Sequence, residues 1–279
     1  MLFEDTQLKR QPIRFLNAAI LGSDVEVGSE TWNLFLRDVF TDLTQKAGQK
    51  CTAIRRVFVP RSLADAAASE LVERLAAVKV GDPSREDVGM GPVSTAAQQD
   101  DVRAGIRRLA TECEVLCGGP DRPKGLLGVA EGKGWFVAPT LLRARDAKTA
   151  KVPHEHEVFG PASTLLEYDG SVADVAALVR RGDGGLVASV FSDDRDFVHG
   201  MATEIGAWHG RLYLGSANMA AMSPGPGTAL PGVVHGGPGR AGGGEELGAF
   251  RGMALYQQRT ALEGDRALIE KVFPRPTPS

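Results

Sequence analysis

The chain has 279 residues, 43% of them hydrophobic and 24% charged, with a net charge of -3. This composition is ordinary for a globular protein with a sizeable core, and the spread of Lys and Arg along the chain gives no electrostatic footprint for nucleic acid or an anionic membrane. No N-terminal apolar run resembles a signal peptide or a spanning helix. Because the three cysteines cannot all pair, thiols in a reducing cytoplasm are expected rather than disulfides.

Helical and strand-like patterns alternate along the chain. From Ser29 to Ala47, apolar residues recur at three- and four-residue spacing, which predicts one long helix with Gly48 as its C-cap. Ser62 and Asp65 have the spacing of a capping box for the next helix. In chain order, the other expected elements are a strand at 55–60, helices at 62–75 and 94–111, strands at 114–119, 134–142 and 163–170, a helix at 172–182 capped by Ser171 with Asp174, and strands at 185–194 and 210–217.

This alternation indicates an α/β fold in layers, with a largely parallel sheet. No internal repeat and no long linker interrupts it. The segment 223–244 holds a large share of the glycines and prolines, so we predict a loop that wraps a site or a neighbouring chain.

Cys51 stands in the stretch KAGQKCTAIRR, directly after the long helix. A thiol becomes reactive where nearby cations and N–H groups favour the thiolate and a turn exposes the sulfur. Gly48 allows such a turn, and Lys50, Arg55 and Arg56 supply positive potential, although the C-terminal end of a helix disfavours a thiolate. From these residues alone, Cys51 is either a nucleophile or a buried structural cysteine.

Other motifs are read as structural. Cys113 and Cys117 have no matching second pair, so we expect no metal site there. His154 and His156, in HEH, lack a third ligand at useful spacing and are expected to be solvated loop histidines. Residues 237–242, GPGRAG, fit G-x-G-x-x-G but lack the preceding strand and following βαβ unit of a dinucleotide fingerprint.

Three ordered segments resemble the aldehyde dehydrogenase superfamily. KAGQKCTAIRRVFVP resembles its nucleophile segment, and HEHEVFGPASTLLEYDG resembles its Glu-x-Phe-Gly-Pro stretch. VVHGGPGRAGGGEELGAFRG is similar to the Gly-rich segment of the branch that oxidises ring-opened, CoA-linked semialdehydes. This branch includes the dehydrogenase part of the phenylacetate-catabolism ring-opening protein and its relatives from aerobic benzoate degradation. The resemblance runs from about Asn17 onward.

The resemblance implies the catalytic-domain fold of that superfamily, with three layers, and NAD or NADP as cofactor. It implies that Cys51 is the nucleophile, with its backbone N–H as an oxyanion donor. Glu157 matches the carboxylate that accepts hydrogen bonds from the nicotinamide ribose, and Phe159 matches the aromatic beside the cofactor. Without the resemblance, Glu157 reads as a solvated loop acid and Phe159 as a core aromatic.

The resemblance also divides the chain. We expect 1–23 to be a divergent remnant of the junction with the cofactor domain, 24–244 the catalytic domain and 245–279 a C-terminal oligomerisation segment. The N-terminal dinucleotide-binding domain of the superfamily is expected to be mostly absent. Its general base, a glutamate, would fall within 9–14, where KRQPIR has no carboxylate. Residues 215–227 also depart from the pattern of the CoA-linked branch.

The implied reaction is NAD(P)-dependent oxidation of an aldehyde, for which a CoA-linked semialdehyde from aromatic-acid catabolism is the candidate, through a thiohemiacetal and a thioester on Cys51. Three interpretations stay open. The chain is a truncated or partner-dependent catalytic half, completed by a cofactor-binding chain; or a non-catalytic relic or assembly partner of a full-length homologue; or a cysteine-dependent hydrolase. The tail 253–273 resembles a segment that pairs across a subunit interface, so we expect a homo-oligomer.

Overall fold

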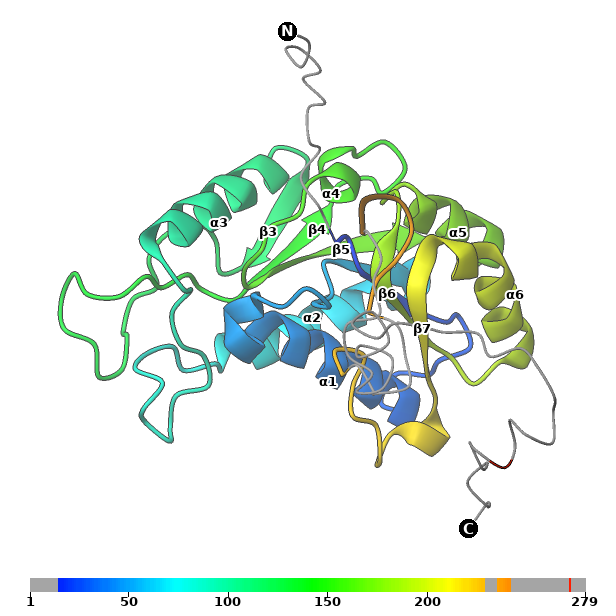
Figure 1. Cartoon of the computed structure of the whole chain (residues 1–279), viewed down its shortest axis with the longest axis horizontal. Coiled ribbons are helices and arrows are strands. Elements are labelled where there is room, and N and C mark those ends of the chain that lie inside the picture. The colour runs from blue at the N-terminus through cyan, green and yellow to red at the C-terminus, as the bar shows by residue number, and fades with distance from the viewer. Residues whose placement is uncertain (1–14, 229–234, 242–270, 272–279) are drawn as a thin grey trace, which may run out of the picture.

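A computed structural model describes residues 15–228, 235–241 and 271 of the chain (Figure 1). The strands are β1 Ala18–Leu21, β2 Arg56–Pro60, β3 Cys113–Cys117, β4 Thr140–Ala144, β5 Ala162–Tyr168, β6 Gly185–Phe191 and β7 His209–Gly215. The α-helices are α1 Glu30–Thr44, α2 Ala64–Ala76, α3 Ala96–Leu109, α4 Val152–Glu155, α5 Val172–Arg180 and α6 Arg195–Ile205, and short 3-10 turns include Gln45–Gly48, Arg61–Leu63, Gly206–Trp208, Ala217–Met219 and Gly239–Ala241.

The seven strands form one sheet in the order β3-β4-β5-β2-β1-β6-β7. Every neighbouring pair is parallel except β3 and β4, which are antiparallel. Figure 1 shows α1 and α2 beneath the sheet and α3, α5 and α6 above it. The predicted α/β fold with a largely parallel sheet is therefore confirmed.

The side chains of the central strand β1 divide between two hydrophobic cores. Ala18 and Ile20 pack in the core beneath α3, α5 and α6, whereas Ala19 and Leu21 pack in the core against α1 and α2. All four residues are fully buried because both faces of a parallel sheet are covered by helices. This strand was not among the expected elements, since four apolar residues show no alternation.

Helix α1 begins as predicted but ends earlier. The Ser29 side chain accepts a hydrogen bond from the Trp32 N–H and caps the helix. Its last residue is Thr44, because Lys46 (φ 53°), Ala47 (φ 50°) and Gly48 (φ 67°) all adopt left-handed backbone conformations. Gly48 is therefore part of a left-handed turn and not the C-cap of α1.

Other caps and one strand also differ from expectation. Ser62 does not cap α2: the helix starts after Leu63, which makes no side-chain cap. Thr95, rather than Ser94, caps α3, whereas the predicted cap of α5 by Ser171 is confirmed by a hydrogen bond from the Asp174 N–H. The strand expected at 134–142 is confined to β4, after Pro139, because a proline cannot donate to a sheet ladder.

Two predicted features lie outside the described residues. These are the segment 9–14, where the general base would fall, and nearly all of the closing segment 253–273. Within the part of the chain that the structure describes, no helix is long and apolar enough to cross a membrane.

Candidate active site

The turn that carries Cys51 lies at the amino-terminal edge of the sheet, just before β2. Cys51 is partly buried, and its thiol is free. The left-handed turn before it brings Gly48 against the segment that precedes β5. A Cβ at Gly48 would lie 2.3 Å from the carbonyl oxygen of Gly160, so only glycine permits both the backbone conformation and this approach. The expectation that Cys51 is presented on a turn is met, and a position deep in the core is ruled out.

Asn17 fixes the Cys51 turn to the neighbouring strand β6. Its amide Nδ2 donates to the carbonyl oxygens of Cys51 (2.8 Å) and Ala53 (3.1 Å). Its Oδ1 accepts from the N–H groups of Leu186 (3.1 Å) and Val187 (3.0 Å). A buried amide with both donors and its acceptor used has one favourable orientation. Asn17 therefore positions the turn, a role that sequence reasoning did not assign because the partners are 34 to 170 residues away.

Arg55 joins the Cys51 turn to the loop before β5. Its Nη2 donates to the carbonyl oxygens of Gly48 (2.8 Å) and Lys50 (3.3 Å), just before Cys51. Its Nη1 donates to the carbonyl oxygen of Gly160 (2.8 Å). Burial lowers the pKa of Arg55, and attraction to Glu157 opposes that shift. One buried guanidinium thus holds two loops that are about 100 residues apart in the chain.

Glu157 and Phe159 lie on that second loop. Glu157 is an acceptor for the Phe15 N–H (2.9 Å) and an ion-pair partner of Arg55, with its side chain only 8% exposed. Phe159 is 38% exposed and has the Arg55 guanidinium 5.5 Å from its ring centroid. Without the resemblance, Glu157 is expected to be a solvated loop acid and Phe159 a core aromatic. Both expectations are wrong.

The charges near Cys51 differ from those expected. Lys50 donates to the buried Asp42 carboxylate at 2.5 Å; burial raises the pKa of Asp42, and Lys50 opposes that shift. Arg56 extends away from the thiol and donates to the Leu16 carbonyl oxygen (2.8 Å), and burial lowers its pKa to about 9. Arg55 is the expected cation that does act on Cys51.

A second guanidinium near the thiol was not predicted. Burial lowers the pKa of Arg211, and attraction to Cys51 and Asp42 opposes that shift. Its Nη1 and Nη2 donate to the carbonyl oxygens of Thr228 (2.6 Å) and Pro226 (2.7 Å), which hold the side chain in place. Two guanidinium groups, those of Arg55 and Arg211, therefore lie close enough to Cys51 to interact with it electrostatically.

The Cys51 sulfur contacts the side chain of His235. Its Nε2 lies 3.3 Å from Sγ, although the two residues are 184 positions apart. Sequence reasoning had included His235 in the third resembling segment without a role. The segment itself was the available signal, but only the fold brings it to the thiol.

The HEH motif does not behave as expected. His154 is 1% exposed, and its Nε2 contacts the Ala147 carbonyl oxygen at 3.0 Å, so it is not solvated. Burial, aided by Arg56, lowers its pKa to about 3. Among the described residues no group of His, Cys, Asp and Glu can hold a metal ion.

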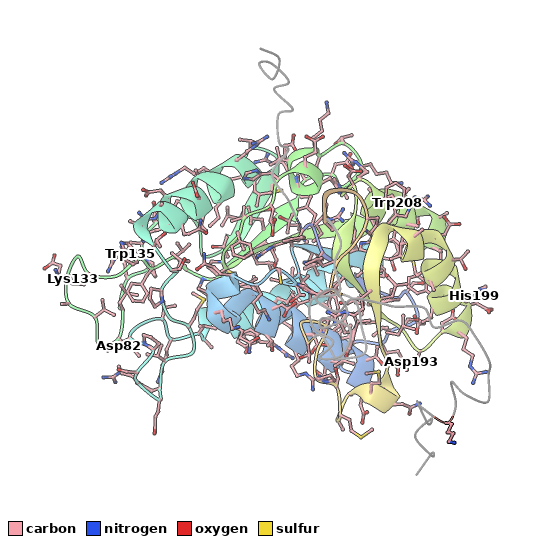
Figure 2. The ribbon with its side chains drawn as sticks, in the orientation of Figure 1. Asp82, Lys133, Trp135, Asp193, His199 and Trp208 are labelled. Atoms are coloured by element: carbon pink, nitrogen blue, oxygen red, sulfur yellow. The ribbon has the colours of Figure 1, made fainter. Side chains whose placement is uncertain are left out.

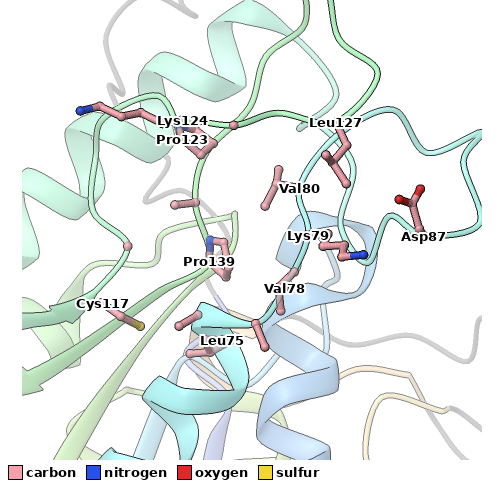
Figure 3. Close-up of a pocket in the computed structure, with 15 residues that line it drawn as sticks. Leu75, Val78, Lys79, Val80, Asp87, Cys117, Pro123, Lys124, Leu127 and Pro139 are labelled. Atoms are coloured by element: carbon pink, nitrogen blue, oxygen red, sulfur yellow. The ribbon is translucent and has the colours of Figure 1, made fainter.

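Among the cavities that the described residues line, two include residues named above. Figure 3 shows a cavity of about 490 Å³ between the end of α2 and the 117–139 segment; it includes Cys117 but none of the residues around Cys51. The other, about 420 Å³, is bordered by Arg211, Tyr213 and Pro224–Pro226. Arg211 is therefore common to the lining of this cavity and to the charges that act on Cys51.

Comparison with known proteins agrees with this geometry. Residues 29–258 match the sequence profile of the aldehyde dehydrogenase family. The chain belongs to that family. All three resembling segments fall inside the matched range, so the predicted resemblance is confirmed.

Two curated proteins are similar in sequence to this chain. The chain is 39% identical over 224 residues to a 3,4-dehydroadipyl-CoA semialdehyde dehydrogenase of Aromatoleum evansii, covering 80% of this chain and 43% of the relative. It is 37% identical over 188 residues to Protein MaoC of Klebsiella aerogenes, covering 66% of this chain and 52% of that protein. The chain therefore spans about half the length of the curated relatives it matches.

Solved structures show the same fold. Betaine aldehyde dehydrogenase of Staphylococcus aureus, in complex with NAD+, superimposes with a TM-score of 0.72 at 23% identity, over 87% of this chain and 44% of that chain. Aldehyde dehydrogenase C of Pseudomonas syringae, in complex with NAD+ and octanal, gives 0.71 at 26% identity over 87% and 45%. The fold is that of the aldehyde dehydrogenase catalytic domain.

Proposed function

We propose that this chain carries the nucleophile of an NAD(P)-dependent aldehyde dehydrogenase, with Cys51 as the attacking residue. The observation that carries the proposal is the junction made by Arg55, which holds the Cys51 turn beside the loop of Glu157 and Phe159. A partly accessible thiol, a positioned carboxylate and an exposed aromatic then share one edge of the sheet.

The chain's own residues act on the aldehyde in a defined order. Asn17 and Arg55 fix the carbonyl groups of the Cys51 turn, which leaves the sulfur and the Cys51 N–H directed by one rigid backbone. The sulfur attacks the aldehyde carbon and gives a thiohemiacetal, whose developing oxyanion the Cys51 N–H stabilises. Loss of hydride leaves a thioester on Cys51, which water hydrolyses to the acid.

The residues before β5 fit the nicotinamide end of a dinucleotide. Glu157 is oriented by Arg55 and the Phe15 N–H, and a carboxylate can accept from both hydroxyls of a ribose. Phe159 keeps an exposed ring beside it, against which a cofactor can pack. When bound, NAD or NADP supplies the hydride acceptor. The NAD+ in both solved relatives supports this assignment.

The substrate we propose is a CoA-linked semialdehyde from aromatic-acid catabolism, such as phenylacetate degradation. Its support is the similarity to the Aromatoleum evansii enzyme, which bears that substrate class in its name. The cavity of about 420 Å³ beside Arg211 is where we place the aldehyde end.

We further propose that the chain works in the cytoplasm as a catalytic half, in a homo-oligomer or with a complementary cofactor-binding chain. The division into 1–23, 24–244 and 245–279 stays part of this proposal. The alternative is a non-catalytic relic or assembly partner of a full-length homologue.

Reduction of NAD+ and of NADP+ by the purified chain tests the proposal, with the aldehyde supplied as a CoA-linked semialdehyde or a simple aliphatic aldehyde. The assay is run alone and with a separately purified dinucleotide-binding domain of a full-length homologue. We expect turnover in the mixture, abolished by Cys51→Ala and strongly reduced by Glu157→Gln. Cys117→Ser, a thiol outside the site, is the matched control and should retain activity.

The outcomes separate the alternatives. Turnover that persists in Cys51→Ala contradicts the assignment of the nucleophile. A complex that forms without any turnover, under conditions where the full-length homologue is active, favours the assembly partner.

A cysteine-dependent hydrolase is the second candidate, and the contact between Cys51 and His235 favours it. Nucleophilic Cys next to His is a recurrent arrangement for acyl transfer. Hydrolysis of an activated ester without any dinucleotide, and without aldehyde oxidation in the mixture, would make this the better assignment.

A further inference from the structure

We propose that His235 is the proton acceptor for the Cys51 thiol and therefore a catalytic residue of this site. The inference rests on the proposed function in that Cys51 is taken as the nucleophile. Its basis is the contact of Nε2 with Sγ at 3.3 Å, between two partly buried side chains. A base has to lie within hydrogen-bond reach of the proton that it takes, directly or through one water.

The loop that carries His235 is fitted closely to the sheet. The carbonyl oxygen of Gly236 would lie 1.5 Å from a Cβ at Gly210, and the carbonyl oxygen of Pro238 would lie 2.2 Å from a Cβ at Gly184. Gly184 also has a φ of +95°, which other residues adopt at a cost. Backbone therefore packs directly on backbone at the start of β6 and β7, and this contact sets the position of His235.

The other charges around the sulfur cannot replace this histidine. Arg55 and Arg211 attract a thiolate, but a guanidinium does not accept a proton near neutral pH. Glu157 is turned to Arg55 and the Phe15 N–H, and Asp42 is turned to Lys50. Among the described residues, His235 is thus the group with a basic nitrogen at the sulfur.

The proton transfers balance without any further reactant. In the tautomer with its proton on Nδ1, Nε2 takes the Cys51 proton as the S–H bond breaks. The sulfur electron pair forms the C–S bond, the carbonyl π pair moves to oxygen, and the imidazolium returns the proton to that oxygen. Hydride loss to the dinucleotide of the proposed function forms the thioester carbonyl, and the hydroxyl proton passes through Nε2 to solvent. Nε2 then takes a proton from the attacking water as its oxygen bonds to the carbonyl carbon. The C–S bond then breaks, and the proton passes to the leaving sulfur.

Alkylation of Cys51 by iodoacetamide measures the first of these transfers without a dinucleotide. The sulfur displaces iodide, and peptide mapping distinguishes Cys51 from Cys113 and Cys117. For His235→Gln we expect a rate at pH 7 that is roughly tenfold below wild type, with the difference vanishing above about pH 10, where thiols ionise unaided. His199→Gln, on the exposed surface of α6 (Figure 2), is the control and should match wild type. Equal rates for His235→Gln and wild type at pH 7 overturn the inference.

A measurement on the wild-type chain covers the case in which the variant does not fold. Diethyl pyrocarbonate modifies histidine, and hydroxylamine reverses it. We expect Cys51 alkylation to slow in proportion to the modified fraction of His235, and to recover with hydroxylamine. Full modification of His235 with an unchanged alkylation rate overturns the inference. If modification of His235 slows alkylation but the protein never oxidises an aldehyde, the proposed function is contradicted and the inference about His235 stands.

Discussion

Arg55 and Glu157 form a buried ion pair, with Nε and Oε1 3.5 Å apart, across the junction between the Cys51 turn and the loop that carries Phe159. Their side chains are 3% and 8% exposed. The pair orients the Glu157 carboxylate, and the same guanidinium holds the carbonyl oxygens of Gly48 and Lys50, just before Cys51. Site geometry and stability are coupled through one guanidinium.

Arg55→Met should destabilise the protein by about 3–5 kcal/mol, because it leaves the buried Glu157 charge without its guanidinium. Urea unfolding followed by circular dichroism measures this. Arg180→Met removes the half-exposed pair with Glu204 and should cost at most about 1 kcal/mol. The double variant Arg55→Met with Glu157→Gln should recover part of the unfolding free energy that Arg55→Met loses, because no buried charge is left unpaired. Strictly additive losses from the two substitutions would contradict a coupling between Arg55 and Glu157.

Gly48→Ala should disturb the site more than its size suggests. The left-handed conformation costs an alanine about 1–2 kcal/mol, and its Cβ would also meet the Gly160 carbonyl oxygen at 2.3 Å. Gly28 has a φ of +83° with open space around it, so Gly28→Ala carries the backbone cost alone. Comparing the melting temperatures of the two variants isolates the contribution of the contact between Gly48 and Gly160. Equal losses of melting temperature would show that this close approach of the two loops does not contribute to stability.

Gly210→Ala should lower the reactivity of Cys51 while leaving both Cys51 and His235 in the chain. The added methyl would displace the Gly236 carbonyl and shift the loop that carries His235. We expect iodoacetamide alkylation at pH 7 to slow several-fold, in the direction of His235→Gln. The matched change Gly206→Ala, whose nearest contact would be an ordinary 3.9 Å, should have no effect on the rate. A Gly210→Ala protein that alkylates like wild type would argue against loop packing as the positioning device.

The buried His154 should make the protein less stable in mild acid. Burial lowers its folded pKa to about 3, so between that value and its ordinary 6.5 the unfolded chain binds the extra proton. Stability is fully present above about pH 6.5 and falls as the pH drops, by about 2 kcal/mol from this group between pH 7 and pH 5. His209, with a pKa lowered to about 4, acts in the same direction.

Urea unfolding at pH 7 and pH 5 checks this expectation. His154→Gln should lose less stability than wild type on acidification, and the exposed His199→Gln should behave like wild type. Burial raises the pKa of Asp38 to about 6, which acts in the opposite direction, but this group is common to all three proteins. An identical pH dependence of wild type and His154→Gln would refute the role of His154.

Most of the fold could be predicted because its helices and strands carry strong local patterns. Helix α1 and the α5 cap follow from apolar spacing and from a serine at the right position. Strand β1 was not predicted because it is short and buried on both faces, so its sequence shows no alternation. Helix α6 was not predicted either, although Phe197, Met201 and Ile205 stand at four-residue spacing and are all buried.

The site could be predicted only where it lies within a contiguous motif. Cys51, Glu157 and Phe159 were named from their segments, and the fold brings those segments together. The contacts of Asn17, Arg211 and His235 join residues far apart in the chain, so no local spacing indicates them. The position of Lys50 on Asp42 likewise depends on how α1 ends.

Because Cys51 precedes β2 and both Glu157 and Phe159 precede β5, the opposite rim of the sheet is left for other uses. There, Ser23 after β1 meets Gly170 after β5 through an exposed hydrogen bond of 3.1 Å. Loop tips of this kind tolerate insertions and tags well, since little backbone is buried in them. A fluorophore or an affinity handle grafted at that rim would report on the protein without touching its thiol chemistry.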